Sequence, residues 1–512
     1  MAFAKLSSCG IKGIDGYILS VETDIAAGLP GIDIVGLADT AVKESKERLK
    51  SAIKNSGFSI PQKKIIINLA PANTKKTDVY LDLPMSIAIL AASGQIAEHL
   101  TEDYLILGEL SLDGEIRSAS GVLPSAITAR ENGIKKMLVP SENAAEASVV
   151  DGIEVYGAKT LAQAVAHLRG EEKIEPAKFD AGAVFASNGG FDVDFCDVHG
   201  QESAKRALEI AAAGGHNCLM IGSPGSGKTM LAKRLPTILP PLTFDESLEV
   251  TKIYSIAGKL PPQVPLITKR PFRSPHHTLS SVALTGGGTV PRPGEISLAH
   301  RGVLFLDEFP EFRKDAIDAL RQPIEEGKVT VSRAAGTVTF PGAVMLIASM
   351  NPCKCGYYGD PTRECTCTPG QIQRYLGKVS GPMLDRFDMH IEVAAVKYDE
   401  LASGEKSESS ADIAKRVKAA RQIQLKRYGG LSIYCNAQLD AALIEKFCPL
   451  SSDCKALLKT AFENLGLSAR AHSRILKLSR TIADLEGSEN IELAHIAEAI
   501  QYRSLDKKFW YR

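Results

Sequence analysis

The stretch CLMIGSPGSGKTMLAKRL, Cys218 to Leu235, decides the fold of this 512-residue chain. An apolar segment, 218–221, runs into the loop GSPGSGKT, and residues typical of a helix follow. A strand, a glycine-rich loop and a helix in this order are the context in which the pattern G-x-x-x-x-G-K-[ST] binds phosphate groups. An ordinary glycine-rich turn is the alternative, and the presence of all three parts disfavours it. The stretch therefore predicts an α/β core built around a phosphate-binding loop.

The residues of this loop predict an ATP site. Glycines let backbone N–H groups turn inward around phosphates at the start of a helix, where anions are favoured. Lys228 is expected to reach the β- and γ-phosphates, and the Thr229 hydroxyl is expected to bind Mg²⁺. The predicted nucleotide-binding residues are Gly222, Ser223, Pro224, Gly225, Ser226, Gly227, Lys228 and Thr229.

Two later apolar segments end in polar residues that suit ATP hydrolysis. The segment RGVLFLDEF contains Asp307 and Glu308 at its end. Asp307 is predicted to hold Mg²⁺ through water, and Glu308 to polarise the water that attacks the γ-phosphate. An acidic pair of this kind can also serve only as a helix cap, but the upstream loop favours catalysis. The segment AVMLIAS leads to Asn351, which is predicted to help place the same water.

The order of these motifs resembles that in the YifB/ComM family of magnesium-chelatase-like AAA+ ATPases, over essentially the whole chain. Further blocks that carry the resemblance are FRSPHHTLSSVALTGGG, VSRAAGTVTFPG, SGPMLDRFDMHIEV and LSARAHSRILKLSRTIADL. The resemblance implies a helix-2 insertion at residues 271–290 and a β-hairpin at residues 329–341. It also implies ring assembly, with a homo-hexamer as the expected oligomer.

The same resemblance assigns roles to two arginines. Arg386 in MLDRFD matches the arginine finger that reaches the ATP of a neighbouring subunit, and Arg470 in LSARAHSRIL occupies the sensor 2 position at the start of a lid helix. A guanidinium group in either place stabilises the negative charge of phosphoryl transfer. The alternatives are a local salt bridge from Arg386 to Asp385 or Asp388 and simple solvation of Arg470 on a helix surface.

The amino-terminal part resembles a different protein. The segments LDLPMSIAILAASGQI and LGELSLDGEIRSASGVLPSAITARENGIKKMLVPSEN are similar to the proteolytic domain of Lon, which needs a serine nucleophile and a lysine base. Asp82 stands where the serine belongs, and Leu123 stands where the lysine belongs. Ser86 and Ser125 are out of register and are interpreted as ordinary helix residues. The domain is therefore expected to be a non-proteolytic scaffold for ring assembly or for a protein partner that the sequence does not identify.

The length of the chain exceeds what one hydrophobic core supports, so several domains are expected. The predicted fold class is α/β with a Lon-protease-like α+β domain, a P-loop AAA+ core containing a parallel sheet, and a helical lid. The expected boundaries are 1–170 for the Lon-like domain, 171–193 for a linker, 194–395 for the core and 396–512 for the lid.

Four of the 10 cysteines form two C-x-C pairs directly after Asn351. The intervening GYYGDPTRE contains Gly, Asp and Pro, which suit a tight reversal that brings the pairs together. Four thiolates match a structural tetrahedral zinc site, and the alternative is a set of reduced thiols that only pack. The predicted zinc ligands, in the loop 353–367, are Cys353, Cys355, Cys365 and Cys367.

Charge and targeting signals narrow the possible partners. Lys+Arg and Asp+Glu both number 60, so no global field attracts the chain to a polyanion and DNA binding has to be local. No signal peptide or membrane-spanning run is evident, which predicts a cytoplasmic protein without a membrane partner. A basic run supplies candidate DNA contacts, and mere solvation is its usual role. The candidates are Lys252, Lys259, Lys269, Arg270 and Arg273.

Two classes of function remain open from the sequence. The resemblance implies a DNA motor that binds single-stranded or branched DNA. Such a helicase drives branch migration during recombination and natural transformation. The competing class is an ATP-driven protein remodeller or a metallochelatase-like chaperone. The chain contains no D-x-S-x-S metal-adhesion motif of the kind that the partner subunit of magnesium chelatase uses. The expected cofactors in the favoured case are ATP, Mg²⁺ and a structural Zn²⁺.

Overall fold

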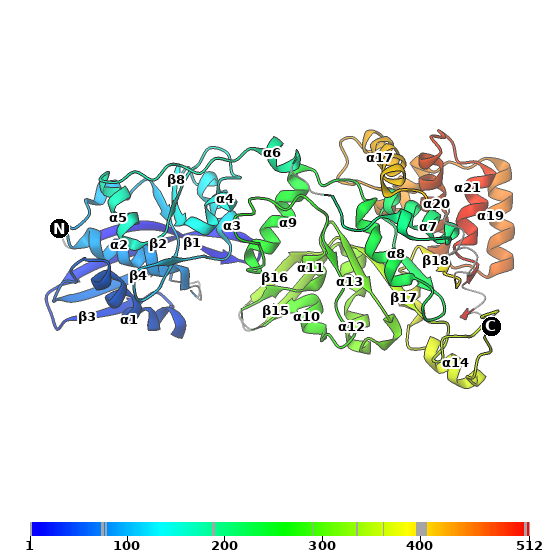
Figure 1. The fold of residues 1–512 in the computed structure, drawn as a ribbon, viewed down its shortest axis with the longest axis horizontal. Helices are drawn as coiled ribbons and strands as arrows, with labels where there is room; N and C mark the ends of the chain where they lie inside the picture. The colour runs from blue at the N-terminus through cyan, green and yellow to red at the C-terminus, as the bar shows by residue number, and fades with distance from the viewer. Residues whose placement is uncertain are drawn as a thin grey trace.

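The computed structural model describes residues 3–72, 76, 79–186, 190–288, 290–333, 336–361, 363–395, 407–505 and 509–510. The described chain is elongated (Figure 1). The amino-terminal domain lies at one end, the core occupies the middle, and the carboxy-terminal helices lie at the other end.

The amino-terminal domain is built on a mixed sheet of seven strands in the order β3-β4-β2-β1-β5-β8-β9. Its long antiparallel hairpin pairs β1 with β2, and the parallel pairs include β5 with β8 and β8 with β9. The segment KIIINLA of β4 alternates buried and more exposed residues, as one covered face requires. The strands are β1 Phe3–Lys12, β2 Asp15–Ala26, β3 Gly31–Val35, β4 Lys64–Ala70, β5 Tyr104–Ile106, β8 Lys136–Pro140 and β9 Glu154–Ala158; the main helices are α1 Thr40–Asn55, α2 Asp82–Ala92, α3 Val122–Glu131 and α5 Leu161–Arg169.

The core contains a parallel sheet of five strands in the order β11-β14-β17-β10-β18, as the sequence predicted. The three central strands are buried along their whole length, which explains why they read as continuous apolar runs. Because all five strands are parallel, their carboxyl ends meet at one edge of the sheet. The strands are β11 Phe272–Arg273, β14 Val303–Leu306, β17 Met345–Met350, β10 Cys218–Ile221 and β18 Met389–Glu392; helices α7 Glu202–Gly214, α8 Lys228–Arg234, α9 Phe244–Ile256, α12 Lys314–Ala319 and α13 Arg321–Glu326 surround them.

The hairpin that the resemblance places next to the core is present, and the segment assigned to the insertion contains short elements. The expected hairpin is formed by β15 (Lys328–Arg333) and β16 (Gly336–Pro341), which are antiparallel. The helix-2 region contains the short α10 (Ser281–Thr285) and β12 (Gly286–Gly287). A Cβ atom at Gly287 would lie 3.1 Å from Nη2 of Arg333, so the insertion and the hairpin are in contact.

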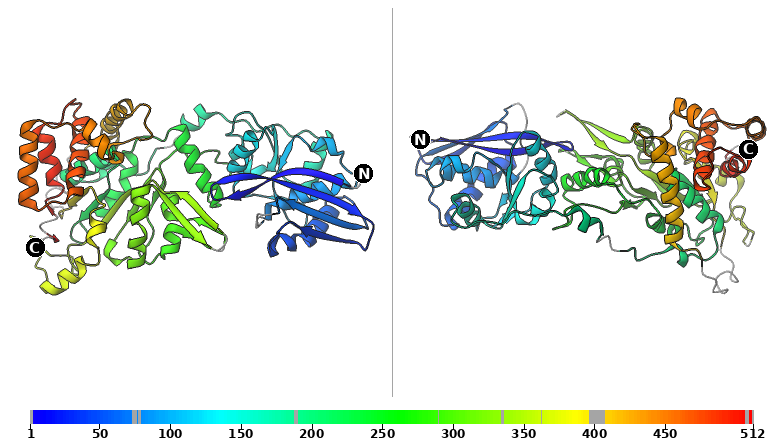
Figure 2. Two further views of the ribbon diagram at one scale, coloured as in Figure 1. Left: turned by 180° about the vertical axis from the view of Figure 1, so that it is seen from behind. Right: turned by 90° about the horizontal axis from the view of Figure 1, so that it is seen from above.

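The amino-terminal domain contacts the core at several places, of which two bear on the site. At one, the backbone N–H of Gly121 donates to the hydroxyl of Ser255 in α9 over 3.1 Å. At the other, the turn between β1 and β2 reaches the hairpin, and a Cβ atom at Gly13 would lie 3.1 Å from Cγ1 of Val338 (Figure 2). The hairpin is therefore in contact with both the insertion and the amino-terminal domain.

The expected linker contains a short helix, α6 (Ala181–Ala186), and otherwise lacks regular structure where it is described. The lid is helical as predicted, although residues 396–406 at its start lie outside the described residues. None of the helices described is long and apolar enough to span a bilayer. The lid helices are α17 Ser410–Arg427, α18 Ala441–Phe447, α19 Ser452–Leu465, α20 Ala469–Leu485 and α21 Leu493–Gln501.

Candidate nucleotide and metal sites

The P-loop follows β10 at the carboxyl edge of the core sheet. Gly225 and Gly227 have φ angles of +79° and +91°, a left-handed conformation that side chains disfavour. A Cβ atom at Gly222 would lie 2.2 Å from the carbonyl oxygen of Val393, so that position has no room for a side chain. The glycines of the motif are thus required by the backbone path.

The Lys228 side chain is largely buried and folds back over the loop. Its Nζ donates to the carbonyl oxygens of Gly222 and Ser223 over 2.7 and 2.9 Å and lies 3.4 Å from Oδ1 of Asn351. Burial lowers its pKa to about 8, against the opposing charges of Asp307 and Glu308. The contact brings the predicted sensor residue Asn351 to the same place as the phosphate-binding lysine.

The predicted magnesium ligands meet directly. The hydroxyl of Thr229 donates to Oδ2 of Asp307 over 2.7 Å. The other oxygen, Oδ1, accepts hydrogen bonds from Ser349 and from the backbone N–H of Glu308. A hydroxyl and a carboxylate at this distance suit a hard cation such as Mg²⁺, so Thr229 and Asp307 fit the expected ion. Ser349 is a positioning residue that sequence reasoning missed, because its link to Asp307 exists only once β14 and β17 pair.

Glu308 has an uncommon backbone conformation, with φ of 51°. Oε2 of Glu308 lies 3.6 Å from Nδ1 of His277, which comes from the segment after β11. The motif FRSPHHT therefore supplies a side chain next to the expected water-polarising carboxylate. Its proximity could have been inferred from the sequence only if the neighbouring positions of β11 and β14 had been known.

Arg386 lies at the opposite edge of the sheet from the P-loop of its own chain. It precedes β18, which runs parallel to β10, whereas the P-loop follows β10. Its carbonyl oxygen accepts from Asn217 at the start of β10 over 3.2 Å. Its guanidinium pairs with Glu325 at 2.8 Å, not with Asp385 or Asp388. The side chain faces away from its own expected nucleotide site.

Arg470 is exposed in the first turn of α20. One turn later, Arg474 pairs with the buried Asp388 at 3.0 Å, and Asp388 is also 3.5 Å from His216. Arg470 therefore lies toward the Arg386 edge. A cavity of about 470 Å³ at this edge is lined by Arg386, Arg474, Lys477, Arg421 and Arg270 among others.

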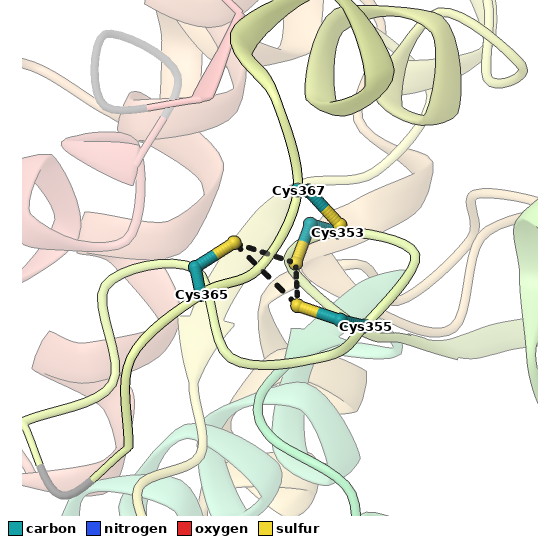
Figure 3. A group of neighbouring side chains, drawn as sticks. All are labelled: Cys353, Cys355, Cys365 and Cys367. Carbon is teal, nitrogen blue, oxygen red and sulfur yellow. Dashed lines mark hydrogen bonds between the residues drawn. The ribbon is translucent and has the colours of Figure 1, made fainter.

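The four clustered cysteines lie together (Figure 3), with their ligand atoms all within 4.8 Å of one another. Sγ of Cys353 is 3.3 Å from that of Cys355 and 3.6 Å from that of Cys365. Four sulfurs at Zn–S bonds of about 2.3 Å would be about 3.8 Å apart in a tetrahedron. The set therefore fits zinc with only small adjustments. Burial would raise the pKa of Cys355, but hydrogen bonds from the N–H of Tyr357 and from Cys353 outweigh it and lower the pKa to about 5.

The members of the basic run have partners within the chain. Arg270 pairs with Glu246 at 2.9 Å and donates to backbone carbonyl groups, and Arg273 pairs with Glu295 at 2.6 Å. The remaining members also have partners in the chain, namely Lys252 with Asp15, Lys259 with Glu295, and Lys269 with the carbonyl group of Gly190. These partners hold the two arginines against the core, and DNA binding by the run stays a prediction.

The Lon-like domain contains no serine–lysine pair at the predicted positions. Asp82 is fully buried and forms a 2.9 Å ion pair with Arg48, while Leu123 lies in the core. Ser86 and Ser125 are buried in helices, and the Ser125 hydroxyl donates to the carbonyl group of Gly121 over 2.8 Å. These positions have structural roles.

Comparison with known protein families finds a matching family model for the amino-terminal domain, for the core and for the lid. The family model described as "Magnesium chelatase, subunit ChlI" matches residues 194–401, the model "Subunit ChlI of Mg-chelatase" matches 21–143, and the model "Magnesium chelatase, subunit ChlI C-terminal" matches 407–503.

Individual relatives match along nearly the full length. The chain is 44% identical to "Uncharacterized protein YifB" of Salmonella typhimurium over 99% of its own length and 98% of that protein. It is 43% identical to "Competence protein ComM" of Haemophilus influenzae over the same shares. "Lon protease 2" of Bacillus subtilis is 28% identical over 28% of the chain and 29% of that protein.

Proposed function

Because the chain belongs to the YifB/ComM family of magnesium-chelatase-like AAA+ ATPases, we propose that it assembles into a hexameric ring that couples ATP hydrolysis to branch migration of DNA. The observation that carries this proposal is the position of Arg386. It lies at the sheet edge opposite its own P-loop, so it can act on phosphoryl transfer only in a neighbouring subunit.

Each active site is then shared between two subunits. One subunit supplies Lys228 for the phosphates, Thr229 and Asp307 for Mg²⁺, and Glu308 for the attacking water, with Asn351 beside the lysine. The next subunit supplies the Arg386 guanidinium, which would leave Glu325 for the more highly charged γ-phosphate. A positive group placed where charge develops lowers the barrier to phosphoryl transfer.

The case for DNA rests on the relatives and on the hairpin. A full-length relative bears the name "Competence protein ComM". Within the chain, Arg333 at the end of β15 lies against Gly287 of the helix-2 region. Motion of the insertion would therefore move the hairpin. We propose that the hairpin contacts DNA through its basic residues, Lys328 and Arg333.

We also propose that the cysteine cluster holds a structural Zn²⁺. The closely spaced thiols carry the proposal. Since four thiolates leave no open position, such an ion would stabilise the loop and would not bind substrate.

The test is movement of a synthetic four-way junction by the purified chain with Mg²⁺ and ATP. Wild type is expected to move the junction, and Arg386→Ala is expected to lose both movement and ATP hydrolysis. Arg313→Ala is a matched control, since Arg313 is exposed and pairs only with Asp315 among the described carboxylates. ATP hydrolysis without any junction movement by wild type would instead support a protein remodeller.

A further inference from the structure

The cysteine loop lies directly against the P-loop. Where β17 ends, the carbonyl group of Met350 accepts from the N–H of Gly222 over 3.2 Å. Beyond it, two residues between the cysteine pairs reach the next P-loop positions, with Gly356 touching Pro224 and Asp360 bonding to Ser223. The first half of the P-loop is thus supported from outside by the segment that carries the four thiols.

The contact between Gly356 and Pro224 is close. Gly356 has φ of +89°, and a Cβ atom there would lie 2.4 Å from Cδ of Pro224. No side chain fits in that space without a shift of one of the two loops. The backbone of the cysteine loop therefore sets where Pro224 can lie.

Asp360 makes the polar contact. Oδ2 of Asp360 accepts a hydrogen bond from the Ser223 hydroxyl. Oδ1 accepts from the N–H of Arg363 over 3.2 Å, and the Asp360 N–H donates to the carbonyl group of Tyr357 over 3.1 Å. These bonds fix Asp360 within the turn that joins the two C-x-C pairs, so its position depends on the closure of that turn.

Aromatic contacts also support the loop, with Tyr358 against Phe509 and the Arg363 guanidinium over the Tyr357 ring. The described part of residues 353–367 contains neither a helix nor a strand. Cys353 is buried, while the other three thiols are partly exposed. A segment without ladder hydrogen bonds keeps one shape mainly through crosslinks, and a metal at four thiolates is such a crosslink.

We propose that the metal-closed cysteine loop braces the P-loop, so that a thiophilic divalent cation at the four thiolates is required for tight nucleotide binding although it never touches the nucleotide. The inference rests on the proposed ATP and zinc sites and adds the link between them. Asp360 and Gly356 are the positioning residues. Loss of the cation would weaken ATP binding by releasing Ser223 and Pro224, with Lys228 and Thr229 still in place.

The test measures the dissociation constant of a fluorescent ATP analogue together with the zinc content and melting temperature of the full chain. Asp360→Ala and Gly356→Ala are expected to retain zinc and to weaken binding by about tenfold, the scale of one lost hydrogen bond to a charged group. Asp360→Asn keeps an acceptor for Ser223 and is expected to bind nearly as wild type does. Gly430→Ala is the matched control, since Gly430 has φ of +85° and nothing within 4 Å.

A double variant adds a specific readout. If the two side chains act through one bond, Asp360→Ala should add little to the loss already caused by Ser223→Ala. Zinc removal from wild type should weaken binding at least as much as Asp360→Ala does, since it releases the Pro224 contact as well. Unchanged nucleotide affinity after zinc removal would contradict the proposal that the cysteine loop supports the P-loop. Equal affinities in Asp360→Ala and Gly430→Ala would contradict it as well. If wild type binds ATP but no zinc, the proposed metal site and with it the support of the P-loop are refuted. If wild type binds no ATP, the proposed ATPase function itself is refuted.

Discussion

Glu308 is the residue on which hydrolysis is expected to depend most. It follows the buried strand β14 directly, and its carboxylate is exposed near His277. Glu308→Gln keeps the size of the side chain and removes its ability to accept a proton. We expect hydrolysis to fall by about 100-fold or more while ATP still binds, because general-base catalysis is worth about 10²–10⁴ in rate.

Single-turnover hydrolysis and binding of a labelled nucleotide separate these two effects. Lys228→Ala is the contrasting variant, expected to lose binding itself. A Glu308→Gln variant with wild-type turnover would remove Glu308 from the mechanism.

The thiol cluster predicts about one zinc ion per chain, the stoichiometry of a four-thiolate site. Changing Cys353 and Cys365 together to Ser should release the ion, since serine hydroxyls stay protonated and bind zinc poorly. Cys9 and Cys454 are buried in other parts of the chain, so changing both of them to Ala should leave the zinc content unchanged. Metal analysis of the purified chain gives the answer, and a metal-free active wild type would show that these thiols only pack.

At the residue scale, the sequence could predict those site residues that are recognised by their spacing along the chain. The P-loop glycines, Lys228, Thr229 and the two cysteine pairs are all identified by their separation along the chain. His277, Ser349 and Glu325 could not be found, because each meets its partner only through strand pairing or packing. The partners of the basic run were hidden for the same reason, since the sequence does not show that Glu246 and Glu295 pair with Arg270 and Arg273.

At the scale of elements, one buried ion pair joins the lid to the core. Asp388 lies just before β18, and its partner Arg474 lies in α20. Burial alone would raise the pKa of Asp388, but the nearby His216 ring and the charge of Arg474 outweigh it and lower the pKa. The stabilisation from the ionised form is therefore present above the unfolded pKa of about 4 and is lost as the pH falls through the lower folded value.

Asp388→Asn should destabilise the core and lid by about 3 kcal/mol at pH 7, because it leaves Arg474 buried without its counter-charge. The difference in melting temperature from wild type should stay constant between about pH 7 and pH 5 and shrink below about pH 4. Asp385→Asn is the matched control, since Asp385 forms no ion pair with any described residue. A loss of stability that is equal in both variants would contradict this role of Asp388.

The elements themselves were largely predictable. Continuous apolar runs identified β10, β14 and β17, and the family resemblance placed a hairpin at residues 329–341, where β15 and β16 lie. The order of strands in the sheet was not predictable from those runs, since it depends on which helices cross over which face. The contact of the β1–β2 turn with Val338 was equally hidden, because it joins residues more than three hundred positions apart.

At the scale of the whole molecule, a single chain is expected to be inactive. Its Arg386 and its P-loop lie at opposite edges of one sheet. Neighbouring copies have to be placed so that the finger of one reaches the nucleotide of the next, which is a heterologous contact that closes into a ring. We infer this requirement from the position of Arg386, whereas the proposed number of subunits rests on the family resemblance.

The most direct test of the shared active site mixes two inactive variants. Lys228→Ala lacks the phosphate clamp but keeps Arg386, and Arg386→Ala lacks the finger but keeps the clamp. In random mixed rings, about one neighbouring pair in four combines an intact clamp with an intact finger. We predict that an equal mixture recovers ATP hydrolysis that neither variant shows alone. A mixture that stays inactive, although native mass spectrometry shows both variants in one ring, would contradict the shared site.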